Sequence, residues 1–318
     1  MQGKLWRVAS SPHIRAGRTT RGIMLDVIVA LLPAGAFGVA WFGLHALWII
    51  AVSVLSAVAW EALWCWMAKK PYTVRDLSAV VTGLLLAYNL PPTVPLWLPI
   101  VGTGIAIVLV KQCFGGLGQN FMNPALAARA ILMSSWVGLM SGTAYSMADA
   151  MTSATPLAQG AEYALDALFW GTIPGCIGEV CKPALLAGGL YLLARRVISW
   201  RVPVTMLLVS FALFWISLGS AESALRQVLS GGLILGAFFM ATDYTTSPIT
   251  GRGQMIGGMI CGALTVLIRI KGGYPEGVSY SILLMNVLTP LIDKWVRPRR
   301  FGEVSAWQKL RSKISRAS

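Results

Sequence analysis

Long runs of uncharged, apolar residues recur between residues 22 and 292 of this chain. The first run, 22–42, lasts about 20 residues, which is the length that a helix needs to cross the hydrocarbon core of a bilayer. Charged residues make up only 12% of the 318 residues, and hydrophobic residues make up 56%. Soluble domains carry roughly 25% charged residues. The chain is therefore predicted to be an all-α integral membrane protein that crosses the bilayer many times.

Ten transmembrane helices are predicted, in two groups of five separated by a long polar segment. The predicted spans are residues 22–42, 44–67, 77–90, 96–110, 124–140, 183–198, 204–218, 228–242, 253–268 and 278–292. The corresponding divisions are a tail (1–21), a first five-helix repeat (22–140), a loop (141–178), a second five-helix repeat (179–292) and a basic tail (293–318). The first run lacks an obvious cleavage site and is interpreted as a retained helix.

The distribution of charge predicts the orientation of the chain in the membrane. Lys and Arg gather in both tails and in the connections after the second and sixth spans, which fall on one side if there are ten spans. The segment 141–178 contains acidic residues but no Lys or Arg. The positive-inside rule therefore predicts cytoplasmic termini and an external 141–178 loop. The turn with Arg269 and Lys271 violates the rule.

The net charge of +14 is attributed to these flanking residues. Nucleic-acid binding is not expected, because the chain has no basic soluble domain to perform it.

Two pairs of segments resemble each other across the predicted halves. Gly83-Leu-Leu-Leu-Ala in the third span resembles Gly232-Leu-Ile-Leu-Gly in the eighth, and 103–116 resembles 263–273. Because five spans per half reverse the direction of insertion, the halves are predicted to form an inverted repeat. The third and eighth spans are predicted to be broken helices that line a central site. Chance similarity between helices rich in Gly and Leu is the alternative.

Few residues suit the commonest catalytic or metal-binding chemistry. The chain has two histidines, and its five cysteines form no Cys-x-x-Cys pair, so haem, zinc and iron–sulfur ligation are not expected. No Walker loop, His-Glu-x-x-His site or Gly-x-Ser-x-Gly elbow is present. Cys176 and Cys181 either form a disulfide or serve as unpaired apolar filler.

The 141–178 segment contains Asp149-Ala-Met-Thr-Ser-Ala-Thr155 followed by Pro. The residues alone indicate an ordinary solvated loop. The stretch is, however, similar to the Asp-x-x-Ser/Thr-Gly/Ser-Ala-Thr motif on which a flavin transferase esterifies FMN, and Asp149, Thr152, Ser153, Ala154 and Thr155 match it position by position. That resemblance implies a phosphoester between the Thr155 hydroxyl and FMN, with the small Ala154 leaving room for the nucleotide.

A second stretch, Lys111-Gln-Cys-Phe-Gly-Gly-Leu-Gly-Gln-Asn-Phe-Met-Asn-Pro-Ala, resembles the signature of the D subunits (RnfD) of Rnf complexes. It also resembles the related B subunit of the sodium-pumping NADH:quinone reductases. Segments 9–15, 240–243, 272–277 and 289–293 fit the same family, so the resemblance covers nearly the whole chain. The short N-terminal tail favours the Rnf member, because the quinone reductase protein carries a longer extension.

This resemblance implies a component of an ion-translocating ferredoxin–NAD oxidoreductase in the bacterial cytoplasmic (inner) membrane. Its implied cofactors are covalent FMN and bound riboflavin, which pass electrons across the membrane in a process coupled to Na⁺ or H⁺ transport. Its implied partners are the A, B, C, E and G subunits of the Rnf complex, a flavin transferase and the lipid bilayer. The alternatives are a quinone-linked component and a solute permease of a urea- or ammonium-channel-like fold.

Asn120 and Asn123 offer carboxamide donors and acceptors near the start of the fifth predicted span. Their spacing of three residues predicts that they share one helical face. The resembled family binds its riboflavin around this sequence, so both are candidate riboflavin contacts. Helix capping is the alternative, since Asn favours that position.

Acidic residues inside membrane spans are costly, at about 2.5–3.5 kcal/mol each on insertion scales. Glu61 and Asp243 are the candidates here. Each is expected either to assist cation passage or cofactor orientation, or to pair with an Arg at a packing contact.

Overall fold

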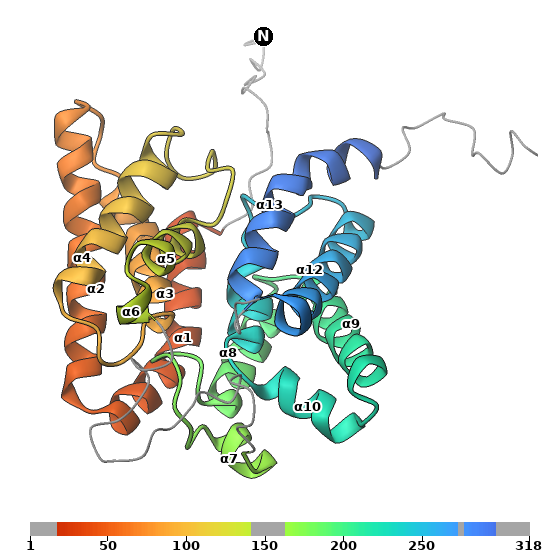
Figure 1. The fold of residues 1–318 in the computed structure, drawn as a ribbon. Helices are drawn as coiled ribbons and strands as arrows, with labels where there is room; N and C mark the ends of the chain where they lie inside the picture. Colours follow the sequence, from red (N-terminus) through yellow and green to blue (C-terminus); the bar gives the residue numbers. More distant parts are fainter. Residues whose placement is uncertain (1–17, 141–162, 273–276, 297–318) are drawn as a thin grey trace, which may run out of the picture.

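The computed structural model describes residues 18–140, 163–272 and 277–296. Every regular element within these ranges is a helix, as Figure 1 shows, which confirms the predicted all-helical fold. Four helices are long and apolar enough to cross a membrane, and one bent pair of shorter helices is a fifth candidate. The other predicted spans also coincide with helices. The chain is thus a multi-pass membrane protein.

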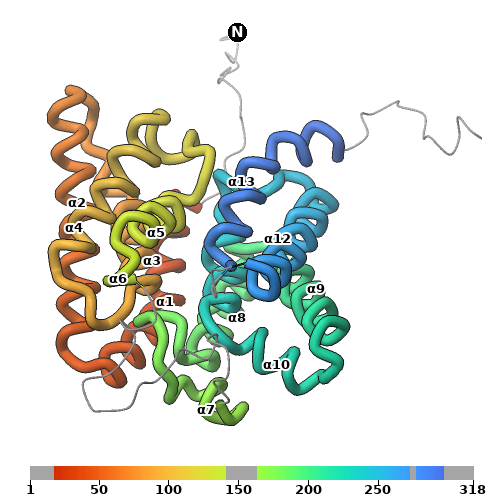
Figure 2. Tube along the Cα trace, viewed as in Figure 1, coloured from red at the N-terminus to blue at the C-terminus, as the bar shows by residue number. Residues whose placement is uncertain are grey.

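The helices before and after the 141–162 gap form two groups. The first comprises α1 (Thr20–Phe42), α2 (Leu44–Met67), η1 (Val74–Asp76), α3 (Ser78–Tyr88), α4 (Trp97–Gly104), η2 (Ile105–Gln112), α5 (Pro124–Ser135) and α6 (Val137–Met140). The second comprises α7 (Leu165–Trp170), α8 (Lys182–Ala194), α9 (Arg201–Leu218), α10 (Ala221–Leu229), α11 (Leu233–Leu235), η4 (Gly236–Met240), α12 (Gly251–Lys271) and α13 (Val278–Trp295). Figure 2 shows the two groups side by side.

The two groups meet where α1 packs on α8 and where α5 packs on α13. A Cβ atom on Gly188 of α8 would collide with the carbonyl oxygen of Ala30 of α1, so the two backbones approach closely because this residue is glycine. Nearer the start of α1, the Asp26 carboxylate pairs with Arg195 at 3.3 Å and accepts a hydrogen bond from Tyr191 at 3.1 Å. Close packing and an ion pair therefore join the same two helices.

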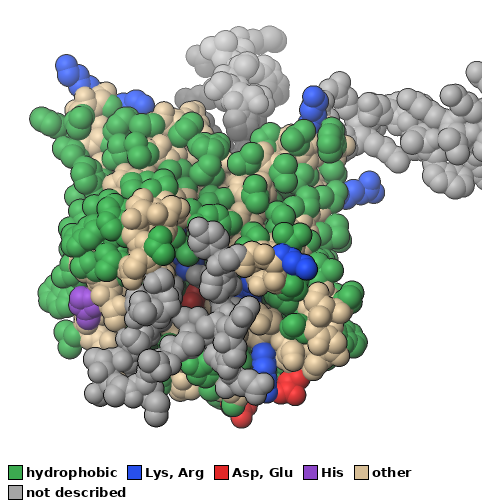
Figure 3. Space-filling model, viewed as in Figure 1, with side chains coloured by type: hydrophobic (Ala, Val, Ile, Leu, Met, Phe, Trp, Pro, Cys, Tyr) green, Lys and Arg blue, Asp and Glu red, His purple; other side chains and the backbone are tan. Residues whose placement is uncertain are grey.

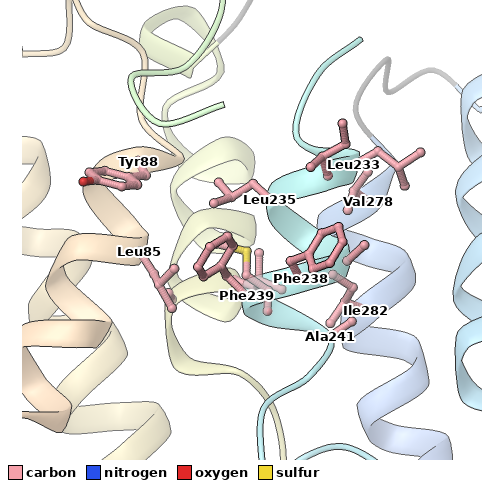
Figure 4. Close-up of a cluster of buried hydrophobic side chains, with 14 of the residues drawn as sticks. Leu85, Tyr88, Leu233, Leu235, Phe238, Phe239, Ala241, Val278 and Ile282 are labelled. Atoms are coloured by element: carbon pink, nitrogen blue, oxygen red, sulfur yellow. The ribbon is translucent and has the colours of Figure 1, made fainter. Parts of the chain in front are cut away.

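Of the two spans predicted to be broken, the eighth is broken in the structure, whereas the third is a short helix without an internal break. The third predicted span is reduced to the 11 residues of α3, which ends at Tyr88 just before Pro91 and Pro92. The eighth divides into α10 and the α11–η4 segment, which are bent by 69° relative to each other. The leucines of the two echoing segments are buried in both halves. Figure 4 shows Leu233 close to Val278 on the neighbouring α13, whereas Leu235 projects from the opposite side of its helix.

The outer surface matches a lipid environment. Figure 3 shows hydrophobic side chains over most of one face, whereas the Lys, Arg, Asp and Glu side chains in this view lie mostly toward its two ends. Exposed side chains on the long helices include Leu55 of α2, Leu208 and Ile216 of α9, and Leu267 of α12. Apolar side chains that are this exposed are stable in hydrocarbon, whereas their contact with water would cost free energy.

The segments predicted to share the basic side of the membrane are neighbours. Arg18, just before α1, donates to the carbonyl oxygen of Arg196 after α8 at 3.4 Å. The Ile249 amide in the loop before α12 donates to the Asp293 carboxylate near the end of α13 at 3.0 Å. The start of α1 and the end of α13 accordingly lie at the same end of the molecule (Figure 1).

Arg269, one of the two residues that violate the positive-inside rule, has a structural role. Its guanidinium donates to the backbone carbonyls of Gln227 and Ser230 at 2.5 and 3.0 Å and lies 5.8 Å from the ring centre of Phe214. Carbonyls at a helix C-terminus lack partners within the helix, and Arg269 supplies donors at the end of α10. Local hydrogen bonding accounts for a cation at this position.

Cys176 and Cys181 are both buried and are not joined by a disulfide, so the disulfide alternative is wrong. The Cys176 thiol donates to the carbonyl oxygen of Asn89 at 3.4 Å.

Candidate cofactor pocket

A pocket lies between the two helix groups, at the end of the molecule where α1 begins and α8 ends. It comprises about 790 Å³ of space not filled by protein atoms, a volume that includes open solvent at its mouth. Its described lining residues are Ile23, Met24, Val27, Ser78, Val81, Thr82, Leu85, Lys111, Leu117, Asn120, Asn123, Pro124, Ala125, Leu192, Val197, Ile198, Phe238, Phe239, Thr242, Asp243, Tyr244 and Thr245. Both groups of helices therefore contribute to one site.

Two π-helical segments, η2 and η4, reach this pocket. A π-helix inserts a residue relative to the α-helical register, and such segments are frequent at functional sites. Here η2 places Lys111 at the pocket, and η4 places Phe238 and Phe239 there. Figure 4 shows Phe239 facing Leu85 of α3, while Phe238 lies toward Ile282 of α13. Neither π-helix was predicted from the sequence.

Asn123 caps α5. Its side-chain oxygen accepts hydrogen bonds from the backbone amides of Ala125 and Leu126 at 3.1 and 3.3 Å, and Pro124 follows it as the first helical residue. Its side-chain nitrogen donates to the carbonyl oxygen of Met240, at the end of η4, at 3.4 Å. The capping alternative is thus confirmed, and Asn123 also joins the two halves at the pocket wall.

Asn120 lies in the loop before α5, so the prediction that it shares a helical face with Asn123 is wrong. The reason is local, because the Asn123 cap and Pro124 begin the helix three residues later. The Asn120 side chain donates to the carbonyl oxygen of Met122 at 3.1 Å, and no residue in the described ranges donates to its oxygen. Asn120 remains part of the pocket lining.

Glu61 forms a buried ion pair with Lys111. Its Oε1 atom lies 3.0 Å from Lys111 Nζ and also accepts hydrogen bonds from Thr73 at 2.7 Å and Gln112 at 3.0 Å. Lys111 Nζ in turn donates to the hydroxyl of Ser78 at 2.6 Å. Glu61 therefore lies inside a span, as predicted, but its partner is a lysine and not an arginine. In the sequence, Lys111 stood out only as part of a family signature.

Asp243 follows η4 in a turn and is not inside a helix, so its expected place within a span is wrong. Its carboxylate accepts hydrogen bonds from the hydroxyls of Thr245 and Thr246 at 3.0 and 3.3 Å. Burial raises the pKa of the Asp243 carboxyl, and the hydrogen bonds from the two threonines oppose that shift. Asp243 and Lys111 are the charged residues among the described lining residues.

Arg129 is a buried charged residue that was not predicted as a functional or structural candidate. It lies on α5 with 1% of its surface exposed. Its guanidinium donates to the Asn89 side chain at 2.7 Å and to the Ser279 hydroxyl at 3.1 Å, so it joins α3 to α13. The sequence did contain a signal for this role. Arg129 lies within a predicted span, and charged residues at such positions usually make polar contacts inside the protein.

The predicted flavin-attachment residues Asp149, Ser153, Ala154 and Thr155 lie outside the described residues. The lining of the pocket nonetheless suits a flavin ring. Aromatic and aliphatic walls from η4 and α3 suit the apolar faces of the ring, while Asn120, Thr82 and Lys111 supply polar groups for its edge.

The chain matches the family model described as "NQR2, RnfD, RnfE family" over residues 7–302. It is 53% identical over 304 residues to the D subunit of the Na(+)-translocating ferredoxin:NAD(+) oxidoreductase complex of Acetobacterium woodii, covering 93% of this chain and 95% of that protein. It is 44% identical over 321 residues to the D subunit of the proton-translocating ferredoxin:NAD(+) oxidoreductase complex of Clostridium ljungdahlii, covering 94% and 96%.

Proposed function

Because the chain belongs to the NQR2, RnfD and RnfE family, we propose that it is the D-type membrane component of an ion-translocating ferredoxin:NAD oxidoreductase complex. In that complex it carries electrons across the membrane, coupled to Na⁺ or H⁺ transport. The resemblance to two such proteins along nearly their full length supports this assignment. One of these relatives is named as Na⁺-translocating and the other as proton-translocating, so the proposal includes both ions.

The pocket at η2 and η4 is the riboflavin site of this proposal, and its position between the halves is the observation that carries it. An isoalloxazine ring bound there would supply the reversible electron uptake that this role requires. Phe238, Phe239 and Leu85 form its apolar walls, and Asn120 provides an amide oxygen that no described residue occupies. Asn123 holds the wall in place by capping α5 and bonding to Met240.

Thr155 is the proposed attachment residue for covalent FMN. Its hydroxyl provides the oxygen of the phosphoester, and a flavin transferase is the partner that forms this bond. Asp149, Ser153 and Ala154 complete the recognition sequence. The match of this motif within a chain of the same family supports the proposal.

The proposed topology is ten spans in two inverted five-helix halves, with both termini cytoplasmic in the bacterial inner membrane. Corresponding pairs of helices support it: α1 packs on α8, α5 packs on α13, α2 packs on α4, and α9 packs on α12. The pocket then lies on the cytoplasmic side and Thr155 on the external side. The two flavin positions would be separated by a core of roughly 30 Å. The A, B, C, E and G subunits of the Rnf complex are the proposed partners.

Filling the pocket tests the riboflavin site. We expect Thr82→Trp, a change in the pocket wall, to abolish riboflavin in acid extracts of the purified complex while covalent flavin remains on the chain. Leu208→Trp, on the exposed face of α9, is the matched control and retains riboflavin. Wild-type levels of riboflavin in a folded Thr82→Trp protein would place the cofactor elsewhere.

Substitution of Thr155 tests the attachment. Thr155→Ala is expected to remove the flavin fluorescence of the denatured band and the FMN mass from the intact chain, because the attachment oxygen is gone. Thr155→Ser keeps a hydroxyl and is expected to retain part of the covalent flavin. Persistence of covalent flavin in Thr155→Ala would contradict the assignment.

A further inference from the structure

The Lys111–Glu61 ion pair lies unsymmetrically beside the pocket. Lys111 and its hydrogen-bond partner Ser78 both line the pocket, whereas Glu61 lies behind them and is not part of the lining. The lysine of the pair is therefore nearer to the pocket than the carboxylate is. Asp243, from the turn after η4, is the other charged residue of the described lining.

Both members of the pair are shielded from solvent. Their side chains are 3% and 0% exposed, respectively. Electrostatic interactions at such positions are several times stronger than at a hydrated surface, because little water screens them. The charges of Lys111 and Glu61 therefore act on a bound ring over distances at which surface charges would have little effect.

The charged groups around Lys111 come from three elements. Glu61 belongs to α2 and binds Nζ directly. Asp76 belongs to η1 and accepts hydrogen bonds from the Ser78 amide at 2.8 Å and the Ser78 hydroxyl at 2.6 Å, so it acts on Lys111 through Ser78. Asp243 belongs to the turn after η4. Lys111 is the single cationic side chain among the described lining residues.

We propose that this ion pair sets the reduction potential of the ring in the pocket, with Lys111 raising it and Glu61 restraining that rise. A reduced ring carries added electron density, which the nearby ammonium stabilises, and the carboxylate behind it partly cancels that field. Lys111 is thus a positioning and charge-setting residue for electron transfer. The inference rests on the proposed riboflavin site.

Substitutions of the two residues of the pair are expected to shift the reduction potential in opposite directions, which distinguishes this role from a structural one. Lys111→Met leaves the Glu61 carboxylate uncompensated and is expected to lower the potential of the bound ring. Glu61→Gln leaves the ammonium uncompensated and is expected to raise it. Each shift is on the order of tenfold in the equilibrium constant for reduction, or about 59 mV for a one-electron couple. The double variant is expected to return close to the starting value.

The measurement is a spectroelectrochemical titration of the whole purified complex in lipid nanodiscs, in a Thr155→Ala background that removes the covalent flavin signal. Lys111→Arg keeps the charge and is expected to restore the potential. Lys182→Met is the matched control. It removes another buried lysine, whose Nζ donates to the backbone oxygens of Glu179 and Gly231 and which does not line the pocket, so it should leave the potential unchanged.

Each outcome decides a different point. Opposite shifts, with cancellation in the double variant, support the inference. Shifts of the same sign, or none, in proteins that retain the ring overturn it while leaving the riboflavin site intact. Absence of any noncovalent flavin in the Thr155→Ala complex overturns both the proposed site and the inference.

Discussion

Helices of both halves meet at glycines, but in the first half a buried ion pair accompanies that contact. In the second half, α9 and α12 meet through glycine. A Cβ atom on Gly258 would collide with the Thr205 hydroxyl and would lie 2.8 Å from the carbonyl oxygen of Val202. In the first half, α2 and α3 also meet at a glycine, since a Cβ atom on Gly83 would lie 2.8 Å from the carbonyl oxygen of Ser53. The first half differs because α2 also carries Glu61, which pairs with Lys111.

This difference shows what helix packing does and does not require. None of the buried charged residues in the described chain lies on α9 or α12, so close approach at small residues holds that pair together. A buried ion pair offers no comparable gain, because desolvation of both charges offsets their attraction. The charged pair in the first half therefore points to a role at the pocket. Among the described lining residues, the cation comes from this half, as Lys111.

The largest expected effect comes from breaking the ion pair. Glu61→Ala or Lys111→Ala leaves one buried charge without its partner and should lower the free energy of unfolding by about 3–5 kcal/mol. The measurement is thermal unfolding of the protein in nanodiscs. The double variant Glu61→Leu/Lys111→Met should cost much less, because both charges are removed together. A double variant as unstable as either single variant would mean that the pair is needed for packing.

A side chain at the glycine contact of the second half should have the next largest effect. Gly258→Val pushes α12 away from α9 and should destabilise the protein by about 1–3 kcal/mol, the usual cost of overpacking. Gly138→Ala is the control, because a Cβ atom there meets nothing within 4 Å. Equal unfolding temperatures for the two variants would contradict the glycine-packed description of α9 and α12.

The contact between the halves at Asn123 should contribute less. Asn123→Ala removes the cap of α5 and is expected to cost about 0.5–2 kcal/mol. Asn123→Ser keeps a capping oxygen but loses the donor to Met240. If thermal unfolding shows the serine variant to be as stable as wild type, the capping function dominates. If it matches alanine, the link between the halves dominates.

The smallest expected effect is a dependence on pH at Asp243. Its pKa is raised in the folded protein, so the folded state holds this proton more tightly than the unfolded state does. Stability contributed by the protonated form is present at low pH and is lost as pH rises through the folded pKa. The unfolding temperature of the wild type relative to Asp243→Asn should therefore increase as pH is lowered from about 7 toward about 4. A constant difference would contradict the shift.

Local signals in the sequence predicted a good part of the fold. Apolar runs indicated the helices, Pro91 and Pro92 marked the end of α3, and the charge distribution grouped the segments that lie together at one end. Asn123 before Pro124 is a typical cap and start of a helix, and it is one here. The same signal shows why the shared face of Asn120 and Asn123 was a wrong expectation, since spacing is informative only within one helix.

The pocket was less accessible to prediction, because its parts come from distant segments. Lys111 lies 50 residues from Glu61 in the sequence, and no feature of the residues around either one predicts that the two form an ion pair. Asp243 was placed inside a span because the apolar run reaches Thr242, whereas the π-helix η4 ends at Met240. Register changes of this kind depend on packing against neighbouring helices, and a hydropathy pattern does not report them.

The sequence by itself determined that this chain is helical, apolar on its outside, short at the third predicted span and interrupted at the eighth, because each of these properties depends on residues next to one another. It also determined the family, through signatures spread along the chain. Only the tertiary structure decided that Glu61 pairs with Lys111, that Lys111 and not Glu61 lines the pocket, and that the pocket lies where both halves meet. Those facts depend on which helices pack together, and buried charges gain their strength from the partners and the shielding that packing supplies.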